Sequence, residues 1–391
     1  MDLWSYGVPT GRRERALAAV RHEETDYVPF NFHSIPMVYH KIRDHYGLKN
    51  SEEVADFLGN HVVKIGTDFN YNPWASEIKQ LDLTPSGGPV HTNLDAAGEL
   101  HMDEFGCVWD RSAGMPHPVA YPLADSPDKL DTYEFPDPFR EGRFDQARAL
   151  ADRWRDRAFI FGKLGMVLFE RGWSIRSMPA LMVDMKRRPD FVHALLDRIL
   201  YEWDLPIIDQ QIDIGIDGFY FADDWGTSSG LMFSPDYWRA FIKPRLAIIF
   251  DHCHKRGVYC GLHSDGRISP LFPELIEIGL DIFNPLEPAA MDRFEMKRLY
   301  GDKLTFYGGV DVEHTMPFGT PEEVRAEVRL LARELGKGGG YILQTSHQVL
   351  WDTPMENITA YVEEVRAMAG LDTPRMDSGQ STVGSQQWAV N

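Results

Sequence analysis

Residues 258–265 read VYCGLHSD, an apolar run that ends in the polar residues His263 and Asp265. Runs of this kind recur along the chain, and they cover residues 28–32, 62–69, 159–162, 216–222, 258–262, 281–284, 304–307 and 341–343. Near-continuous apolar runs are typical of strands that are buried on both faces of a parallel sheet. We therefore predict a buried strand at each of the eight runs.

The segments between the later runs carry helix signals. Ser234-Pro235 places an N-cap residue before a proline at the first helical position, and Gly257 follows that segment. Thr320-Pro321 begins another segment by the same chemistry, and Thr353-Pro354 begins the last. Parallel strands need crossovers of about a dozen residues or more, so these repeated units predict a parallel α/β fold. Eight units favour a (β/α)8 TIM barrel over a doubly wound sheet.

Two regions depart from the repeat. Residues 72–156 contain alternating stretches, such as residues 99–109, and then a proline-rich passage around residues 136–138. This pattern predicts a hairpin-bearing insertion after the second strand. The tail, residues 373–391, has the small polar composition of a disordered end. We expect one barrel domain over residues 1–372.

Composition excludes several classes of protein. The chain has 391 residues, of which 43% are hydrophobic and 25% charged, as in globular proteins. Its net charge of −19 opposes binding to nucleic acid or to an anionic membrane surface, and no stretch has the length of a transmembrane helix. The three cysteines form no paired motif, and the amino terminus lacks a signal-peptide pattern. We expect a cytoplasmic protein.

In a barrel, functional residues lie at the carboxyl ends of the strands, so the polar residues after each apolar run are candidates. They are Asn31, His33, Asp68, Asn70, Lys163, Asp223, Asp224, His263, Asp265, Asn284, Glu287, Gly309, Asp311, Ser346 and His347. The set is rich in carboxylates and imidazoles. That composition favours a site over a ring of solvated loops, which would carry more lysine, serine and glycine.

The sharpest pattern is His263-x-Asp265 after the fifth strand, with His347 after the eighth. Alternate residues of an extended segment point the same way, so His263 and Asp265 are able to converge on one atom. An imidazole from another strand would complete a set of two histidines and one carboxylate for zinc or another divalent ion. In the alternative interpretation, the two histidines bind a substrate carboxylate or cap loops.

Asp223-Asp224 is the second candidate. Adjacent residues of a strand point in opposite directions, so one acid would face the barrel mouth while the other caps the loop. We assign the role of acid or base to Asp223. In the alternative, both acids are caps or ion-pair partners. The glycine pairs near residues 308 and 339 lack the spacing of phosphate-binding loops and predict tight turns.

Several motifs together resemble the uroporphyrinogen decarboxylase superfamily. They are GRRER (11–15) with Val28-Pro29, DEFGCVW (103–109), DDWG (223–226), HSDG (263–266), GGVD (308–311) and DTPMEN (352–357). The resemblance covers about residues 11–370 and implies a (β/α)8 barrel. It also implies one of two chemistries: cofactor-independent decarboxylation of uroporphyrinogen, or methyl transfer to or from corrinoids or thiols by zinc-dependent enzymes.

Departures from the family patterns bear on the choice between these chemistries. The decarboxylases carry arginines after the first strand, where this chain has NFHSIPM (31–37) and no arginine. Without them, a polyanionic porphyrinogen would lack its cationic clamp in a protein of net charge −19. The methyltransferases bind zinc through H-x-C and a later cysteine, and these positions are occupied by His263, Asp265 and His347. Such a set suits an oxygen or nitrogen substrate atom better than a thiol.

The leading hypothesis is a methyltransferase component of a corrinoid-linked demethylation system, acting on a small O- or N-methylated substrate. His263, Asp265 and His347 would hold a metal or the substrate heteroatom. The chain has no D-x-H-x-x-G segment, so the corrinoid would be carried by a separate protein. The remaining assignments are Asp223, His263, His347 and Asp68 as catalytic residues and Asn31, His33, Asn70, Lys163, Asn284, Glu287 and Asp311 as substrate-binding residues.

Two alternatives remain at this stage. The first is a decarboxylase of a porphyrinogen or a smaller carboxylate, in which the resemblance gives Asp68 and His347 the leading roles. The second is a non-catalytic relative that binds a small molecule and has lost the chemistry.

Overall fold

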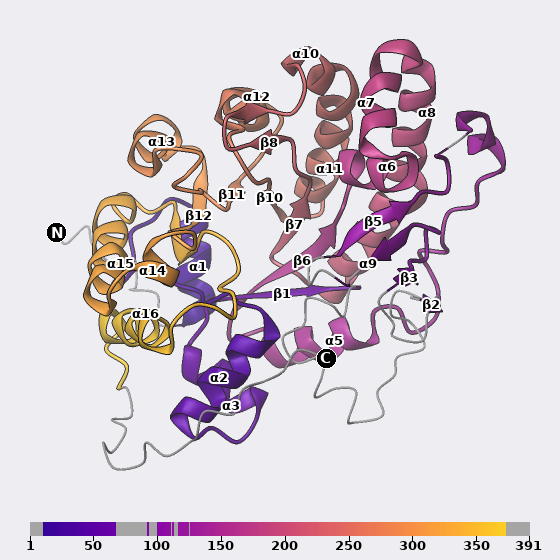
Figure 1. Cartoon of the computed structure of the whole chain (residues 1–391). Helices are drawn as coiled ribbons and strands as arrows, with labels where there is room; N and C mark the ends of the chain where they lie inside the picture. The colour runs from indigo at the N-terminus through magenta and orange to yellow at the C-terminus, as the bar shows by residue number, and fades with distance from the viewer. Residues whose placement is uncertain are drawn as a thin grey trace.

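The computed structural model describes residues 11–67, 92–93, 100–110, 112, 116–124 and 126–372. Its centre is a curled seven-stranded parallel sheet in the order β1-β6-β7-β10-β11-β12-β13, with helices outside it (Figure 1). The strands are β1 (Val62–Gly66), β6 (Phe159–Gly165), β7 (Gly218–Ala222), β10 (Tyr259–His263), β11 (Ile282–Asn284), β12 (Thr305–Val310) and β13 (Tyr341–Thr345). Each of these strands coincides with a predicted one.

The first predicted strand, residues 28–32, is not a strand of this sheet. It makes an isolated bridge to β13, in which Asn31 N donates to Leu343 O at 2.8 Å. On its other side, His61 N donates to Phe30 O at 3.0 Å, just before β1 begins. The segment therefore lies between the two edge strands of the sheet. Its proline lacks an N–H, which removes one bond that a regular ladder would need.

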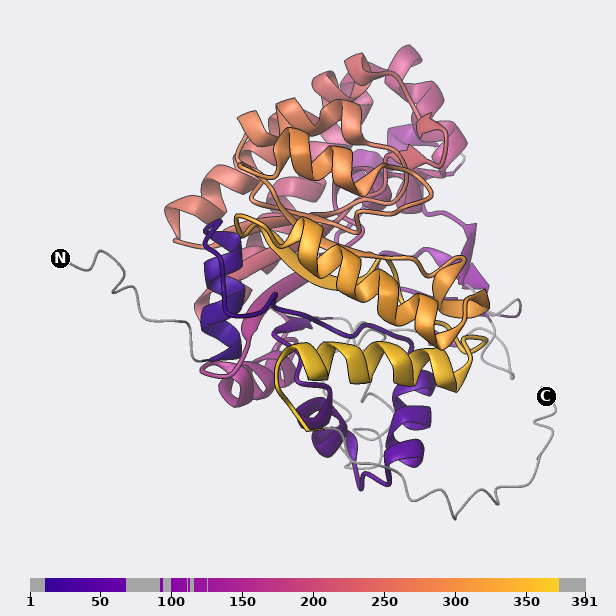
Figure 2. The ribbon, with the colours of Figure 1, turned by 90° about the vertical axis from the view of Figure 1, so that its left-hand side faces the viewer.

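Helices precede, connect and follow the strands of the sheet. They are α1 (Arg12–Val20), α2 (Pro36–Tyr46), α3 (Ser51–Leu58), α5 (Asp145–Trp154), α6 (Leu168–Arg176), α7 (Met178–Arg187), α8 (Pro189–Arg198), α9 (Leu205–Ile214), α10 (Pro235–Tyr237), α11 (Lys243–Lys255), α12 (Phe272–Glu277), α13 (Arg293–Tyr300), α14 (Thr315–Phe318), α15 (Pro321–Leu335) and α16 (Met355–Met368). The π-helical segments η3 (Ile199–Asp204) and η4 (Trp238–Ile242) join α8 to α9 and α10 to α11, and η2 (Pro127–Thr132) and η5 (Ser269–Leu271) are 3-10 turns. In Figure 2, α15 and α16 lie side by side.

The predicted helix starts follow from capping chemistry. The Ser234 side chain accepts a hydrogen bond from Asp236 N. Thr320 forms a capping box with Glu323, which satisfies two backbone N–H groups at the start of α15. In the last helix, Pro354 rather than Thr353 is the N-cap residue. The helix signals were therefore correct to within one residue.

The inner face of the curled sheet is packed at its amino-terminal end. Aromatic and aliphatic side chains from alternate strand positions form this cluster together with one face of α1. Its buried members are Ala16, Ala19, Val20, Val62, Phe159, Phe161, Tyr220, Ile282, Tyr307 and Ile342. Arg13 holds α1 in place through its hydrogen bonds to Asp217, at 3.2 and 2.5 Å. The amino-terminal end is thus closed, and polar groups on this face lie toward the other end.

A second, four-stranded antiparallel sheet lies between β1 and β6 in the sequence and at the right in Figure 1. Its strands are β2 (Thr92–Asn93), β3 (Leu100–Met102), β4 (Val108–Asp110) and β5 (His117–Ala120). Asp103 organises the β3–β4 turn, because its carboxylate accepts from Phe105 N, Cys107 N and Trp109 Nε1 at 2.9 to 3.0 Å. The DEFGCVW motif is therefore a folding element. Other parts of residues 72–156, and the whole tail 373–391, lie outside the described residues.

A two-stranded ribbon, β8 (Gly226–Thr227) with β9 (Gly230–Leu231), follows β7. Among the described residues, no helix is both long enough and apolar enough to cross a membrane.

Candidate functional site

Alternation along the strands brings the polar candidates to one end of the inner face. In the parallel sheet, His263 of β10 lies opposite Ala222 of β7 on one side and Asn284 of β11 on the other. His263 is the last residue of its strand, and His347 follows the end of β13. The strands are parallel, so their carboxyl ends meet, and residues far apart in the sequence come together there.

His263, Asp265 and His347 form one cluster. The Nε2 atom of His263 lies 3.5 Å from Asp265 Oδ1, and the Nε2 atom of His347 lies 3.9 Å from Asp265 Oδ2. One ligand atom from each residue lies within 4.8 Å of the other two. The carboxylate is thus placed between the two imidazoles, as the sequence pattern predicted.

A hydrogen bond to Asn284 fixes the His263 ring. The His263 Nδ1 atom lies 2.7 Å from Asn284 Oδ1, which also accepts from Tyr220 OH at 2.5 Å. The Asn284 amide nitrogen donates to Tyr307 O at 2.6 Å, so its oxygen must be the atom that faces His263. An amide oxygen only accepts, so Nδ1 carries the proton. The lone pair of neutral His263 is therefore on Nε2, the atom that faces Asp265.

This donor set fits a divalent ion. Ligands about 2.1 Å from a tetrahedral zinc ion are about 3.4 Å apart, close to the spacing of His263 Nε2 and Asp265 Oδ1. Burial, followed by the charges of His263 and the lysines Lys64 and Lys163, lowers the pKa of His347, against the opposing effect of Asp265. A lowered pKa favours the neutral imidazole, which is the form that binds metals.

Two glycines hold the loops that carry these residues. Gly266 has φ +76°, and a Cβ atom there would meet Gly226 C at 2.6 Å. A Cβ atom at Gly226 would meet Asp265 O at 2.6 Å. The HSDG and DDWG loops therefore pack backbone against backbone, which only glycine allows. This contact places Asp265 beside the acids that follow β7.

The two adjacent acids after β7 have opposite surroundings. Asp223 is fully buried and accepts from Phe169 N, Glu170 N and Trp225 Nε1 at 3.1, 2.7 and 2.8 Å. It therefore caps the start of α6, although burial raises its pKa to about 8. Asp224 instead faces the cluster, and its Oδ1 accepts from Asp265 N at 2.8 Å.

We expected the acid or base role for Asp223. The structure gives Asp223 the capping position and gives Asp224 the position beside the cluster. The alternation of strand residues requires the two acids to diverge, but it does not say which of them faces inward.

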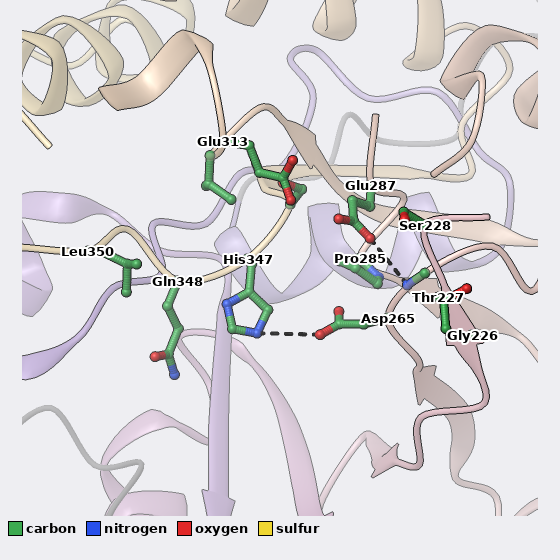
Figure 3. A pocket seen from close by; sticks show the side chains of 13 residues that line it. Gly226, Thr227, Ser228, Asp265, Pro285, Glu287, Glu313, His347, Gln348 and Leu350 are labelled. Carbon is green, nitrogen blue, oxygen red and sulfur yellow. Dashed lines mark hydrogen bonds and ion pairs between the residues drawn. The ribbon is translucent and has the colours of Figure 1, made fainter. Parts of the chain in front are cut away.

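A pocket of about 380 Å³ opens beside the cluster and is lined by Asp265, Glu287, Glu313 and His347, among others. In Figure 3, Asp265 and His347 point toward each other, and a dashed line marks one polar contact of Glu287. That contact is a hydrogen bond of 3.2 Å from Gly266 N to Glu287 Oε2. Burial, followed by Asp265 and Glu313, raises the pKa of Glu287. The outer rim is thus acidic.

The remaining expected residues that were named as catalytic or substrate-binding lie in four different surroundings. His33 lies near the cluster, where burial and the positive groups Lys64, His347, Lys163 and His263 lower its pKa. Asn31 lies deeper and donates to Tyr307 OH and Gln344 Oε1 at 3.0 and 2.8 Å. Asp311 caps the turn before α14 by accepting from Glu313 N and His314 N at 2.7 and 3.0 Å. Asp68 and Asn70 lie outside the described residues.

Sequence reasoning missed three charged residues of this region. Lys64 is on the inner face of β1, with its Nζ atom 3.8 Å from the centre of the Tyr220 ring. Glu170 follows β6, and burial together with Asp224 and Asp223 raises its pKa well above the usual value. Glu313 lines the pocket. A signal for Lys64 was present, since it is a single charge within the apolar strand VVKIG (62–66).

Comparisons with known proteins agree on the fold and the family. The chain is 26% identical over 295 residues to a methylated-thiol–coenzyme M methyltransferase of Methanosarcina mazei, covering 73% of each chain. It is 27% identical over 209 residues to a uroporphyrinogen decarboxylase of Serratia proteamaculans, covering 51% of this chain and 54% of that protein.

A solved methyltransferase structure from Methanosarcina mazei superposes with a TM-score of 0.63 at 18% identity, covering 92% of this chain and 99% of the other. That likeness supports the fold. Residues 101–368, more than half of the chain, match the sequence profile described as uroporphyrinogen decarboxylase (URO-D). Both the resemblance of the motifs and the curled parallel sheet agree with this match, and the chain therefore belongs to the URO-D family.

Proposed function

We propose that this chain is the methyltransferase component of a corrinoid-linked demethylation system that acts on a small O- or N-methylated substrate. The observation that carries the proposal is the cluster of His263, Asp265 and His347 at the carboxyl ends of the strands. Its nitrogen and oxygen donors, without a thiolate, suit the recognition of an oxygen or nitrogen atom. The similarity to a methylated-thiol–coenzyme M methyltransferase supports methyl transfer as the reaction class.

The residues of this chain would hold and orient the substrate. When bound, a zinc or other divalent ion would supply Lewis-acid polarisation of the heteroatom that bears the methyl group. Asn284 would keep the His263 ring in place, and Asp224 takes the acid role that we first assigned to Asp223. When bound, the corrinoid would accept the methyl group, and Asp224 would supply the proton that the heteroatom takes up as its bond to the methyl group breaks.

The corrinoid would be carried by a separate protein in the cytoplasm. The three cysteines of this chain are free and buried thiols, as suits a reducing compartment. We also infer that the segment at residues 28–32 takes the place of an eighth strand, which closes the sheet into a barrel around the site. The hydrogen bonds of this segment to β13 and to the residue before β1 support that closure.

Two of the three arginines of α1, Arg13 and Arg15, do not support the decarboxylase alternative. Arg13 bonds to Asp217, and Arg15 bonds to Asp26 at 2.6 and 2.8 Å, so both are engaged away from the cluster. Neither is available as the cationic clamp that a porphyrinogen with many carboxylates would need.

The test is methyl transfer to cob(I)alamin from a panel of O- and N-methylated compounds, followed by the absorbance of methylcobalamin. We expect turnover with metal-loaded protein and its loss in His263→Ala and His347→Ala. His252→Ala is the matched control, because that histidine is on the outer helix α11 and bonds to Asp209. Turnover at the wild-type rate in both His263→Ala and His347→Ala would contradict a role of the cluster in methyl transfer. Conversion of uroporphyrinogen to coproporphyrinogen would favour the decarboxylase, and binding without turnover would favour a non-catalytic relative.

A further inference from the structure

A lysine projects from the middle of an otherwise apolar strand into the closed inner face of the sheet. Strand β1 reads VVKIG, and Val62 belongs to the inner packed cluster. Side chains two residues apart share a face, so Lys64 points the same way as Val62. Its Nζ atom lies 3.8 Å from the centre of the Tyr220 ring and 5.3 Å from that of Tyr307. The ammonium is therefore held between two aromatic rings.

Lys64 has no counter-charge among the described residues. Within that part of the chain, no carboxylate forms an ion pair with it, and the charged group that acts on it is another lysine, Lys163. Burial first, and then Lys163, holds the pKa of Lys64 well below its usual value. The two cation–π contacts offset only part of the cost of burying an ammonium. A carboxylate placed beside Lys64 would therefore favour the charged form of the lysine and form an ion pair with it.

Lys64 lies near the cluster of His263, Asp265 and His347. The centre of the Tyr220 ring lies 3.8 Å from Lys64 Nζ and 5.8 Å from the centre of the His263 ring, so Lys64 and the cluster share this neighbour. Tyr220 OH also bonds to Asn284, the residue that orients His263. A small molecule that reaches His263 from the pocket is therefore close to Lys64 as well.

The acidic and the basic side chains of the site lie at two different depths, which we call the outer and the inner level. The outer level carries Asp265, Glu287 and Glu313, which line the pocket. The inner level carries Lys64 and Lys163, whose charges both lower the pKa of His33. In a chain of net charge −19, this inner level is a local exception. A polar feature of this kind is typical of a group placed for a ligand, because packing alone would be served better by an apolar residue.

We propose that Lys64, with the added charge of Lys163, binds a carboxylate group of the substrate, while the methylated oxygen or nitrogen of the same molecule lies at His263, Asp265 and His347. This assignment rests on the proposed function and names its substrate class, which is a small methylated carboxylic acid. The inner lysines recognise the acid, and the cluster recognises the heteroatom.

The experiment compares matched pairs of probes that differ only in charge. Methoxyacetate and methoxyacetamide form one pair, and 4-methoxybenzoate and 4-methoxybenzamide form the other. Binding to the zinc-loaded full chain is measured by calorimetry, without any corrinoid. We expect wild-type protein to bind at least one acid 10-fold or more tightly than its amide. Lys64→Met should lose that preference, and Lys64→Arg should keep most of it.

Two controls separate a binding role from a structural one. Lys255→Met removes one charge from the exposed end of α11, where Lys255 pairs with Asp251, and it should leave the preference unchanged. Lys64→Gln replaces Lys64→Met if the latter does not fold, as judged by circular dichroism. Equal affinities for acid and amide in wild-type protein, or no binding of either acid, would overturn the proposal, as would a preference that survives in Lys64→Met. Acid binding without methyl transfer would support the lysine site and contradict the methyltransferase function.

Discussion

Asn284 accepts a hydrogen bond from His263 at 2.7 Å while its own amide group donates to the Tyr307 backbone oxygen at 2.6 Å. These two bonds fix the amide, and the amide fixes the imidazole. We expect Asn284→Leu to weaken zinc binding by about 10- to 100-fold, because the His263 ring loses its orienting acceptor. A competition titration against a chromophoric chelator measures this affinity.

Asn284→Asp is the matched control for this prediction, because it keeps an acceptor oxygen at the same place. Its loss of zinc affinity should be smaller than that of the leucine variant. Zinc binding by Asn284→Leu at the wild-type affinity would show that Asn284 does not orient the ligand.

The two acids after β7 should respond differently to substitution. Asp223→Ala leaves three donors without an acceptor, and each unsatisfied buried donor costs about 1–3 kcal/mol, so we expect a loss of about 3 kcal/mol or more in the free energy of unfolding. Asp224→Asn should leave the stability nearly unchanged and lower methyl transfer. Urea denaturation and the cob(I)alamin assay measure the two effects. A stable Asp223→Ala variant with impaired turnover would restore Asp223 as the acid or base.

His61 should make the fold sensitive to acid. It is 1% exposed and packs against Phe30 at a ring distance of 4.7 Å, and burial lowers its pKa from 6.5 to about 3. The unfolded chain takes up the proton below pH 6.5 while the folded chain does not, so the stability that is present above that pH is lost as the pH falls toward 3.

The contribution of His61 between pH 7 and pH 5 is about 2 kcal/mol. His61→Phe keeps the ring and removes the proton site, and it should reduce the pH dependence of the free energy of unfolding by that amount. Urea denaturation of both proteins at the two pH values measures the difference. An identical pH dependence in the two proteins would mean that His61 does not titrate in this range.

The sequence predicted the strands well because buried parallel strands leave long apolar runs, and each of the seven strands of the sheet coincides with such a run. The same criterion failed for residues 28–32, where a proline breaks the ladder although the hydrophobicity is retained. The convergence of His263 and Asp265 was also predicted, since they are separated by one residue of an extended segment. The capping position of Asp223 was considered only as an alternative and Lys64 was missed, because a linear pattern does not specify which face of a strand meets the inside of the sheet.

The contact between Gly226 and Gly266 gives a prediction that separates crowding from backbone strain. An alanine at position 266 would place its Cβ atom 2.6 Å from Gly226 C and 2.7 Å from Thr227 N, at φ +76°. The loop must then move, and Asp265 moves with it. We expect Gly266→Ala to weaken zinc binding by at least 10-fold, besides the cost of about 1–2 kcal/mol for a left-handed alanine.

Gly257→Ala provides the matched control, because Gly257 has φ +75° and nothing lies within 4 Å of its Cβ position. This variant should lose a similar amount of stability and keep its zinc affinity, since it follows α11 at the opposite end of β10. Chemical denaturation and chelator competition on both variants test the comparison. The backbone strain is the same at both positions, and only the crowding differs. Equal zinc affinities in the two variants would therefore contradict the conclusion that close packing of the two loops positions Asp265.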